Sequence, residues 1–275
     1  MSQSQFVSKC TVDSLQRAAN SLLEGNLVAF PTETVYGLGA DALDKQAVAR
    51  IYQVKGRPAD HPLIVHIHSM QVMGQWVGDV PEYAIGLGRD FWPGPMTLIF
   101  KRSNLAQDFI TGGQDTVGIR VPNHVVVLGL LEAFYNLGGR GVAAPSANRF
   151  GHVSPTTAQA VSDELSEYLN QEDQVLDGGP CAVGVESTII DCTGDAPRIL
   201  RPGGITPEMI KESTGLTPTF VASTDTEEIR VSGSLEKHYS PAAKVLLDQT
   251  PVSGQGFIAP SRRVTPTAHG PPSRT

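Results

Sequence analysis

The stretch "FPTETVYGLG" at residues 30–39 follows an apolar run at 27–29 and leaves it through Pro31. The apolar run has the composition of a buried strand. A connector from a strand to a helix needs only a few residues, so this one is longer than the fold alone requires. It is also rich in hydrogen-bonding groups, which we expect to line a ligand site: Thr32, Glu33, Thr34 and Tyr36.

Helical and strand patterns alternate outward from this stretch. Periodicity and capping residues predict helices at 11–24, 44–57, 81–92, 125–136, 157–169 and 206–213. Short apolar runs predict strands at 26–30, 63–68, 96–100, 116–121, 141–145, 174–179, 186–192 and 197–201. This interleaving indicates an α/β class with a mixed sheet.

Composition bounds the function. The chain has 275 residues, 40% of them hydrophobic, with a formal net charge of -7. A basic field over the whole protein, as in many nucleic-acid-binding domains, is therefore absent. The three cysteines lack zinc-site spacing, and no apolar run is long enough to span a bilayer. We expect reduced thiols, no membrane and a cytoplasmic location.

The sequence contains no convincing match to the common nucleotide-binding motifs. "GLGADA" at 37–42 matches a dinucleotide fingerprint on paper. That fingerprint needs its first glycine directly after a strand and a helix opening within the motif, and here the loop intervenes. The sequence also lacks the P-loop pattern GxxxxGK[ST]. A bound nucleotide would have to be held in another way.

Four cationic residues lie where a predicted helix or strand ends, beside glycine or proline. They are Lys55, Arg57, Arg120 and Arg201. Lysine and arginine both suit phosphate or carboxylate groups. A solvated surface residue is the commoner reading for any one of them, but the four together favour an anionic ligand.

Strand periodicity places polar groups on common faces. Thr116, Gly118 and Arg120 share one face of their strand, and His66 shares a face with Ile64 in another. Taken alone, this pattern favours a half-exposed strand with a polar outer side. "APSAN" at 144–148 and "ESTIID" at 186–191 add serines beside strands, either as ligand contacts or as ordinary turn residues.

Nine stretches in order resemble one family. They are "FPTETVYGLG", "KGRP", "HPLIVHI", "FWPGPMT", "DTVGIRVP", "APSAN", "DGG", "GVESTIID" and "RPGGI". Their order over residues 8–212 resembles the YrdC-like threonylcarbamoyl-AMP synthases. The resemblance implies a twisted, open, mixed α/β sheet with a large concave cavity. It also implies an activity: L-threonine, bicarbonate and ATP give threonylcarbamoyl-AMP and pyrophosphate, for modification of the adenosine beside the anticodon of tRNA.

The resemblance also implies roles for particular residues. Lys55 and Arg57 would be catalytic. The ATP site would comprise Arg57, His61, Thr116, Ser146, Ser154, Arg201 and Tyr239. The threonine site would comprise Thr34, His66, Arg120, Ala144 and Ser187. Mg²⁺ would be held mainly through the triphosphate, and no protein metal site is expected.

The resemblance and a change in composition divide the chain into three parts. Residues 8–216 would form the catalytic domain, and 217–241 a linker that folds as a lid, with Tyr239 in "KHYSP" contacting the nucleotide. Residues 242–275 are expected to be a shortened, disordered remnant of a second, Rossmann-like domain.

Two alternatives stay open. The first is an RNA-binding module of the same fold that acts in RNA maturation without catalysis, against which the acidic net charge argues. The second is a carbamoyl-transferring relative of hydrogenase-maturation proteins, whose zinc-finger-like segments the cysteine spacing here does not match. For the synthase, we also expect transient contact with tRNA or with the machinery that transfers the threonylcarbamoyl group.

Overall fold

The computed structural model describes residues 6–220 and 229–231. The chain divides into two compact units, Met1–Ser240 and Pro241–Thr275, and the second lies wholly outside the described residues. The predicted lid contact at Tyr239 and the predicted remnant at 242–275 also lie outside them, so both stay predictions.

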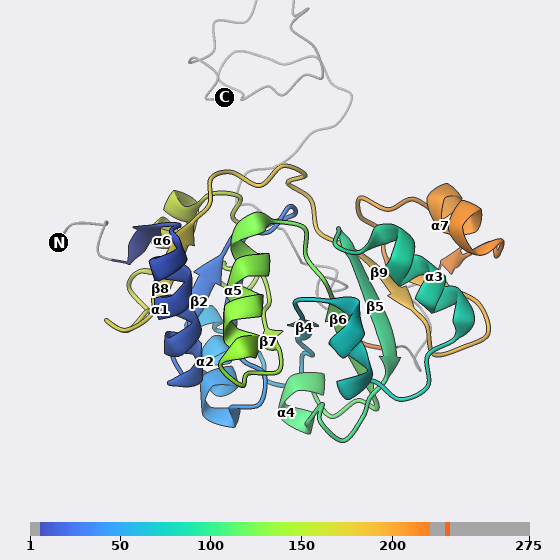
Figure 1. The fold of residues 1–275 in the computed structure, drawn as a ribbon, viewed down its shortest axis with the longest axis horizontal. Helices are drawn as coiled ribbons and strands as arrows, with labels where there is room; N and C mark the ends of the chain where they lie inside the picture. The colour runs from blue at the N-terminus through green and yellow to red at the C-terminus, as the bar shows by residue number, and fades with distance from the viewer. Residues whose placement is uncertain (1–5, 221–228, 232–275) are drawn as a thin grey trace, which may run out of the picture. The chain divides into compact units, whose positions relative to one another are not determined.

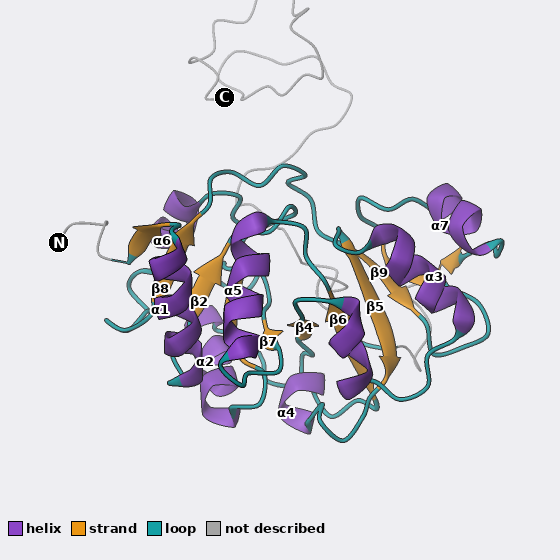
Figure 2. Cartoon of the chain, in the orientation of Figure 1, coloured by secondary structure: helices purple, strands orange, loops and turns teal. Residues whose placement is uncertain are grey.

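A mixed, open sheet organises the described part of the chain (Figures 1 and 2). Its eleven strands there run in the order β1-β8-β2-β3-β7-β4-β6-β5-β9-β10-β11, and the two ends of this order do not pair. The strands are β1 (Val7–Lys9), β2 (Val28–Phe30), β3 (Gly37–Asp41), β4 (Ile64–His66), β5 (Met96–Lys101), β6 (Thr116–Arg120), β7 (Val142–Ala143), β8 (Gln174–Asp177), β9 (Thr188–Asp191), β10 (Arg198–Arg201) and β11 (Thr219–Phe220). The predicted α/β class and open mixed sheet are confirmed.

Helices flank this sheet and connect its strands (Figure 2). They are α1 (Val12–Leu23), α2 (Lys45–Lys55), the 3-10 helix η1 (Met70–Gln75), α3 (Glu82–Phe91), α4 (Asp108–Thr111), α5 (Val125–Asn136), α6 (Ala158–Leu165) and α7 (Pro207–Thr214). Local signals begin several of them. The Asp44 carboxylate accepts hydrogen bonds from the first turn of α2, and Thr11 and Ser14 form a capping box at α1.

The core lies on both faces of the sheet. Val28 and Phe30 of β2 pack in a cluster with α1 and α5, which lie side by side in Figure 1. Ala29, between them, belongs to a second cluster that includes residues of α2, α3 and α6. Neighbouring residues of a strand point to opposite faces, so β2 is covered by helices on both sides.

The quoted stretch differs from its prediction in one respect. Residues 37–41 form β3, which pairs antiparallel with β2, so the stretch closes a hairpin instead of leading directly into a helix. The packing explains the glycines: a Cβ at Gly39 would lie 2.6 Å from both the Phe30 ring and the Val142 side chain. The rejection of "GLGADA" as a dinucleotide fingerprint is confirmed, because this segment is a strand and opens no helix.

Candidate active site

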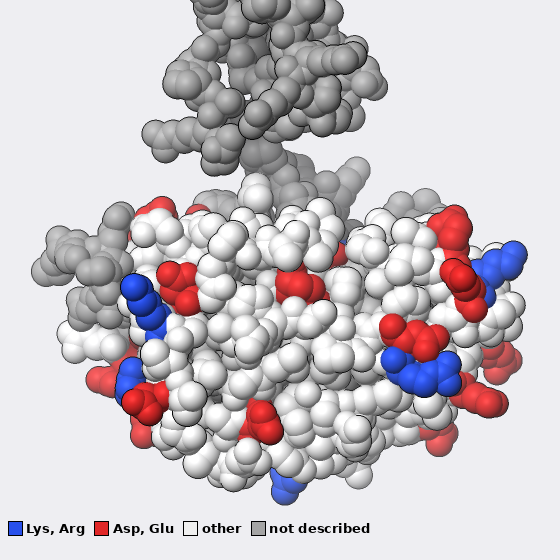
Figure 3. Space-filling view, turned by 45° about the horizontal axis from the view of Figure 1, so that its top comes forward, with Lys and Arg blue, Asp and Glu red and all other residues white. Residues whose placement is uncertain are grey.

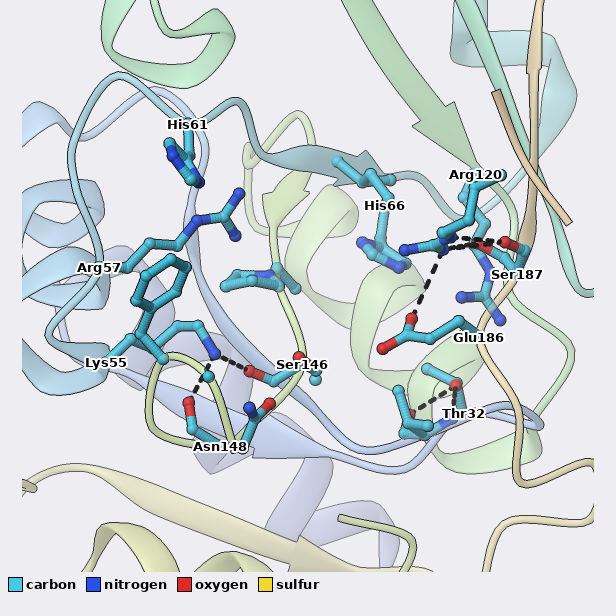
Figure 4. Close-up of a pocket in the computed structure, with 18 residues that line it drawn as sticks. Thr32, Lys55, Arg57, His61, His66, Arg120, Ser146, Asn148, Glu186 and Ser187 are labelled. Carbon is cyan, nitrogen blue, oxygen red and sulfur yellow. Dashed lines mark hydrogen bonds and ion pairs between the residues drawn. The ribbon is translucent and has the colours of Figure 1, made fainter. Parts of the chain in front are cut away.

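One pocket collects most of the residues predicted for the ligand site (Figure 4). The pocket is open to solvent on one side. The predicted residues that line it are Lys55, Arg57, His61, His66, Arg120, Ala144, Ser146, Ser187 and Arg201. Figure 4 shows Lys55 and Arg57 on one side and Arg120 with Ser187 on the other. Segments far apart in the sequence therefore build a single site.

Lys55 and Arg57 come from the C-terminal end of α2. Gly56 caps the helix in the left-handed region, with φ 62°, which turns the chain so that both side chains reach the pocket. The Lys55 Nζ atom donates to the main-chain oxygens of Ser146 (2.5 Å) and Asn148 (2.6 Å). Burial, and then the nearby Arg57 charge, lower the pKa of Lys55 to about 7. An anion bound here would favour the protonated amine.

Arg201 reaches the pocket from the end of β10. Its guanidinium donates to the Ser187 main-chain oxygen (2.8 Å) and to Ser187 Oγ (3.0 Å). Its Nη2 atom also lies 3.5 Å from Glu186 Oε2. A Cβ at Gly203 would lie 2.4 Å from the Thr188 nitrogen, so the glycine lets the chain after β10 approach β9 closely. The side chain is thereby held beside the serine predicted to contact threonine.

Arg120 and His66 form another part of the wall. They are paired residues of the neighbouring parallel strands β6 and β4, a pairing that the sequence did not predict. The Arg120 Nη2 atom donates to Thr34 Oγ1 (2.9 Å) and lies 2.8 Å from Glu33 Oε1. Burial, and then the Arg120 charge, lower the pKa of His66 to about 3. The imidazole is therefore neutral at pH 7.

The loop 31–36 explains why the quoted stretch is polar yet buried. Thr32 Oγ1 lies 2.9 Å from Thr34 Oγ1 and also donates to the Val35 main-chain oxygen. Glu33 accepts a hydrogen bond from the Asn123 main-chain nitrogen through Oε2. The hydroxyls of Thr32 and Thr34 and the Glu33 carboxylate thus have partners, and Thr34 and Glu33 hold Arg120 at the pocket wall.

Four predicted residues lie off the pocket wall or cannot be located. Thr34 stands behind it, through its hydrogen bond to Arg120. Ser154 donates to Glu186, which does line it. Thr116 lines two neighbouring hollows and not this pocket, so the structure does not bring it together with the other nucleotide residues. Tyr239 lies outside the described residues.

Two residues that line the pocket, Phe150 and Glu186, were not predicted from the sequence. The Phe150 ring lies edge-on to His61 with centroids 5.6 Å apart. Glu186 lies in the quoted motif "GVESTIID", which is the signal that could have found it, whereas Phe150 lies outside the quoted motifs. Asn148 of "APSAN" lines the wall, as a ligand contact would, and Glu33 contacts Arg120 without lining the pocket.

The distribution of Lys and Arg on the protein surface bears on the RNA-binding alternative. On the face that Figure 3 shows, Lys and Arg side chains are few and separated by neutral surface. That face offers no continuous basic patch for a nucleic-acid backbone. Within residues 6–220 and 229–231, no helix is both long and apolar enough to cross a membrane.

Together, the fold and the pocket define an α/β protein with a partly buried pocket lined by several cationic side chains. The Sua5_yciO_yrdC family model, described as "Telomere recombination", matches residues 20–203. The chain belongs to this Sua5/YciO/YrdC family.

Similar proteins carry a more specific name. Threonylcarbamoyl-AMP synthase of Pyrococcus abyssi is 45% identical over 85% of this chain and 67% of its own length. The Bacillus subtilis protein of the same name is 42% identical over 85% of this chain and 66% of its own length. The chain thus spans about two thirds of these relatives. The crystal structure of P. abyssi Sua5 complexed with L-threonine superposes with a TM-score of 0.80 at 41% identity, covering 87% of this chain and 69% of that one.

Proposed function

We propose that this chain catalyses the formation of threonylcarbamoyl-AMP and pyrophosphate from L-threonine, bicarbonate and ATP, as the supply step for a tRNA modification. The observation that carries the proposal is one pocket with cationic groups on opposite sides, Lys55 and Arg57 facing Arg120 (Figure 4). Such a pocket can hold a polyphosphate and a carboxylate at the same time. The names of similar proteins supply the particular substrates.

We assign the nucleotide phosphates to Lys55, Arg57 and Arg201. These side chains are less than a tenth exposed, so their charges act with little screening by water. Ser146 adds polar contacts on the pocket wall, and Ser154 acts through Glu186. His61, with its edge-on partner Phe150, is assigned to the nucleoside part of ATP, because flat rings suit a base.

We assign L-threonine to Arg120, His66, Thr34, Ser187 and Ala144. The Arg120 guanidinium suits the amino-acid carboxylate, because its fork can donate two parallel hydrogen bonds. The neutral imidazole of His66 can exchange a hydrogen bond with the substrate without adding a further charge. Ala144 lines the pocket with a small side chain, which leaves space for the substrate.

The proposed chemistry needs placement and charge more than a covalent intermediate. The amine of threonine and bicarbonate give a carbamate and water. A carbamate oxygen then attacks the α-phosphorus of ATP, and the bond from that phosphorus to the β-phosphate oxygen breaks to release pyrophosphate. Negative charge develops on the leaving group, where the cations assigned to the phosphates would stabilise it. No protein nucleophile is required.

The finer points of the proposal concern metal, partners and location. Among the described residues, no group of three or more acidic, histidine or cysteine side chains could hold a metal ion. Mg²⁺ would therefore be bound mainly through the triphosphate and water. The product would pass to the tRNA threonylcarbamoyl-transfer machinery in the cytoplasm, through a transient contact.

The decisive experiment is pyrophosphate release by the full chain. ATP and Mg²⁺ are supplied with threonine and bicarbonate together, with each alone, or with neither. We expect release, with formation of the adenylate by mass spectrometry, only when both are present. Equal release from ATP alone would overturn the synthase. Absence of release under all conditions, together with tRNA binding, would support the noncatalytic RNA-binding module.

A further inference from the structure

Glu186 supplies a carboxylate to a pocket that otherwise gathers cations. Of the described residues that line the pocket, it is the only one with an acidic side chain. Its Oε1 atom accepts a hydrogen bond from Ser154 Oγ (2.8 Å), and its Oε2 atom lies 3.5 Å from Arg201 Nη2. Figure 4 shows the carboxylate pointing into the pocket, and the side chain is 18% exposed.

This carboxylate has opposite consequences for the empty pocket and for a bound nucleotide. In the empty pocket it offsets the positive charge of Arg201. Its charge also acts on Lys55, whose pKa is lowered mainly by burial and raised by Glu186. Beside a bare triphosphate, however, the same negative charge is repulsive, and a partly buried position strengthens that repulsion. A further cation between the carboxylate and the phosphates would remove it.

Mg²⁺ fits this requirement. It usually binds through one or two carboxylates plus substrate phosphates, and it keeps several waters. Glu186 offers one such carboxylate, held in direction by Ser154. The described residues provide no larger cluster that could bind the ion without nucleotide. The donor set therefore suits a metal that enters with the triphosphate.

The other buried glutamate near the pocket is less suited to this role. Glu33 is held by Arg120 through Oε1 and by the Asn123 nitrogen through Oε2. It is not among the residues that line the pocket. A metal bound there would have to displace the guanidinium that we assign to threonine.

We propose that Glu186 makes nucleotide binding depend on a divalent cation, by repelling a bare triphosphate and giving one oxygen ligand to the Mg²⁺ that a triphosphate carries. This rests on the proposed function only in taking the pocket to bind ATP. It assigns the metal dependence of that pocket to one side chain.

The test measures the dissociation constant of ATP by calorimetry, once with Mg²⁺ and once with EDTA, in the absence of threonine. The quantity compared between variants is the dissociation constant in EDTA divided by the dissociation constant with Mg²⁺. In Glu186→Gln we expect this ratio to fall about tenfold or more, since loss of a metal-site partner typically lowers metal affinity by that order. Binding in EDTA should tighten, because the repulsive charge is gone. Glutamine has the same size and can still accept the Ser154 hydrogen bond.

A matched control removes the same charge elsewhere. Glu132 is an exposed glutamate on α5 that does not line the pocket, and Glu132→Gln should leave the ratio as in the wild type. If Glu186→Gln fails to fold, Glu186→Asp replaces it: this variant keeps the charge but shortens the reach. It should weaken binding with Mg²⁺ and leave binding in EDTA unchanged.

If folded Glu186→Gln has the same ratio of dissociation constants as the wild type, the proposal is wrong. It is also wrong if Glu186→Asp binds Mg²⁺-ATP as tightly as the wild type does. Wild-type pyrophosphate release that needs threonine and bicarbonate would keep the proposed function intact in either case. If the wild type binds ATP in neither buffer, the proposed function fails, and this proposal fails with it.

Discussion

Arg120 and Lys55 line the same pocket, but their charged groups have different partners. Arg120 faces the Glu33 carboxylate at 2.8 Å, and both side chains are less than a tenth exposed. Lys55 donates to two main-chain carbonyls and has no carboxylate within ion-pair distance among the described residues. A carboxylate cancels a formal charge, whereas carbonyl dipoles only offset it.

This difference in partners suits the ligands that we assign to the two residues, threonine to Arg120 and the ATP phosphates to Lys55. An amino-acid carboxylate needs a guanidinium whose direction is set, and the contacts of Arg120 with Glu33 and Thr34 set it. A polyphosphate needs positive charge that no carboxylate cancels, which Lys55 can supply. The lowered pKa of Lys55 indicates that the empty pocket bears this charge at some energetic cost.

The largest effect should come from breaking the buried ion pair. Arg120→Met removes the charge and leaves the Glu33 carboxylate buried without its partner. We expect the free energy of unfolding to fall by about 3–5 kcal/mol, measured by urea denaturation. Threonine binding, measured by calorimetry, should be lost while ATP binding changes little.

The double variant Glu33→Gln with Arg120→Met separates stability from binding. Removing both charges should restore most of the lost free energy of unfolding, because no buried charge is left unpaired. Threonine binding should stay absent. A single variant as stable as the wild type would show that the pair is well solvated, and recovery of threonine binding would remove Arg120 from the site.

Lys55→Ala should lower the rate of pyrophosphate release by about 10²–10³-fold, the usual effect of losing one group that stabilises developing charge. Its effect on folding should be smaller than that of Arg120→Met, because the remaining partners are neutral carbonyls. Lys45→Ala is the matched control, since Lys45 is an exposed lysine on the same helix. Near-normal turnover in Lys55→Ala with an unchanged circular-dichroism spectrum would exclude Lys55 from the reaction.

The pH dependence of ATP binding should report Lys55 directly. The protonated amine attracts phosphate, and its pKa is lowered to about 7. Affinity for ATP should therefore decrease as pH rises above about 7, by at most about tenfold per pH unit. Lys55→Arg stays protonated throughout, so it should lack this decrease, and titration of ATP itself is common to both proteins. Parallel profiles from pH 6 to 9 would contradict the assignment.

The smallest expected effect is that of His66 on the pH dependence of stability. The folded protein keeps His66 neutral down to about pH 3, whereas the unfolded chain binds a proton below its ordinary value of 6.5. Stability should therefore fall as pH decreases below 6.5, with His66 contributing up to about 1.4 kcal/mol per pH unit. His66→Gln should flatten this slope in urea titrations between pH 6.5 and 5. An unchanged slope would mean that His66 is protonated in the folded state.

The segment 229–231 illustrates what composition cannot reveal. The sequence predicts a linker over 217–241, but Val231 is only 8% exposed and packs in a cluster with Ile99 and Ile189. Gln114 exchanges hydrogen bonds with the main chain of Arg230 at 2.7 and 3.1 Å. A segment of three residues is too short to show a periodic pattern in the sequence. Its position depends on a hollow formed by strands that are distant in the chain.

Features that depend on neighbours along the chain can be predicted from the residues alone. The bounds of α5, the Asp44 cap of α2 and the shared strand face of Thr116 and Arg120 follow from periodicity and local hydrogen bonding. Such signals act within a few residues, so they can be identified without the fold.

The pairing of charged side chains depends on the three-dimensional fold. Glu33 and Arg120 are far apart in sequence, as are Ser154, Glu186 and Arg201, and their contacts exist because the fold brings loops and strands from distant parts of the chain together. The strand at 37–41 depends likewise on the close approach of Phe30 and Val142, which only glycine permits. Burial then turns ordinary ionisable side chains into groups with shifted pKa values, because the water that would screen them has been removed.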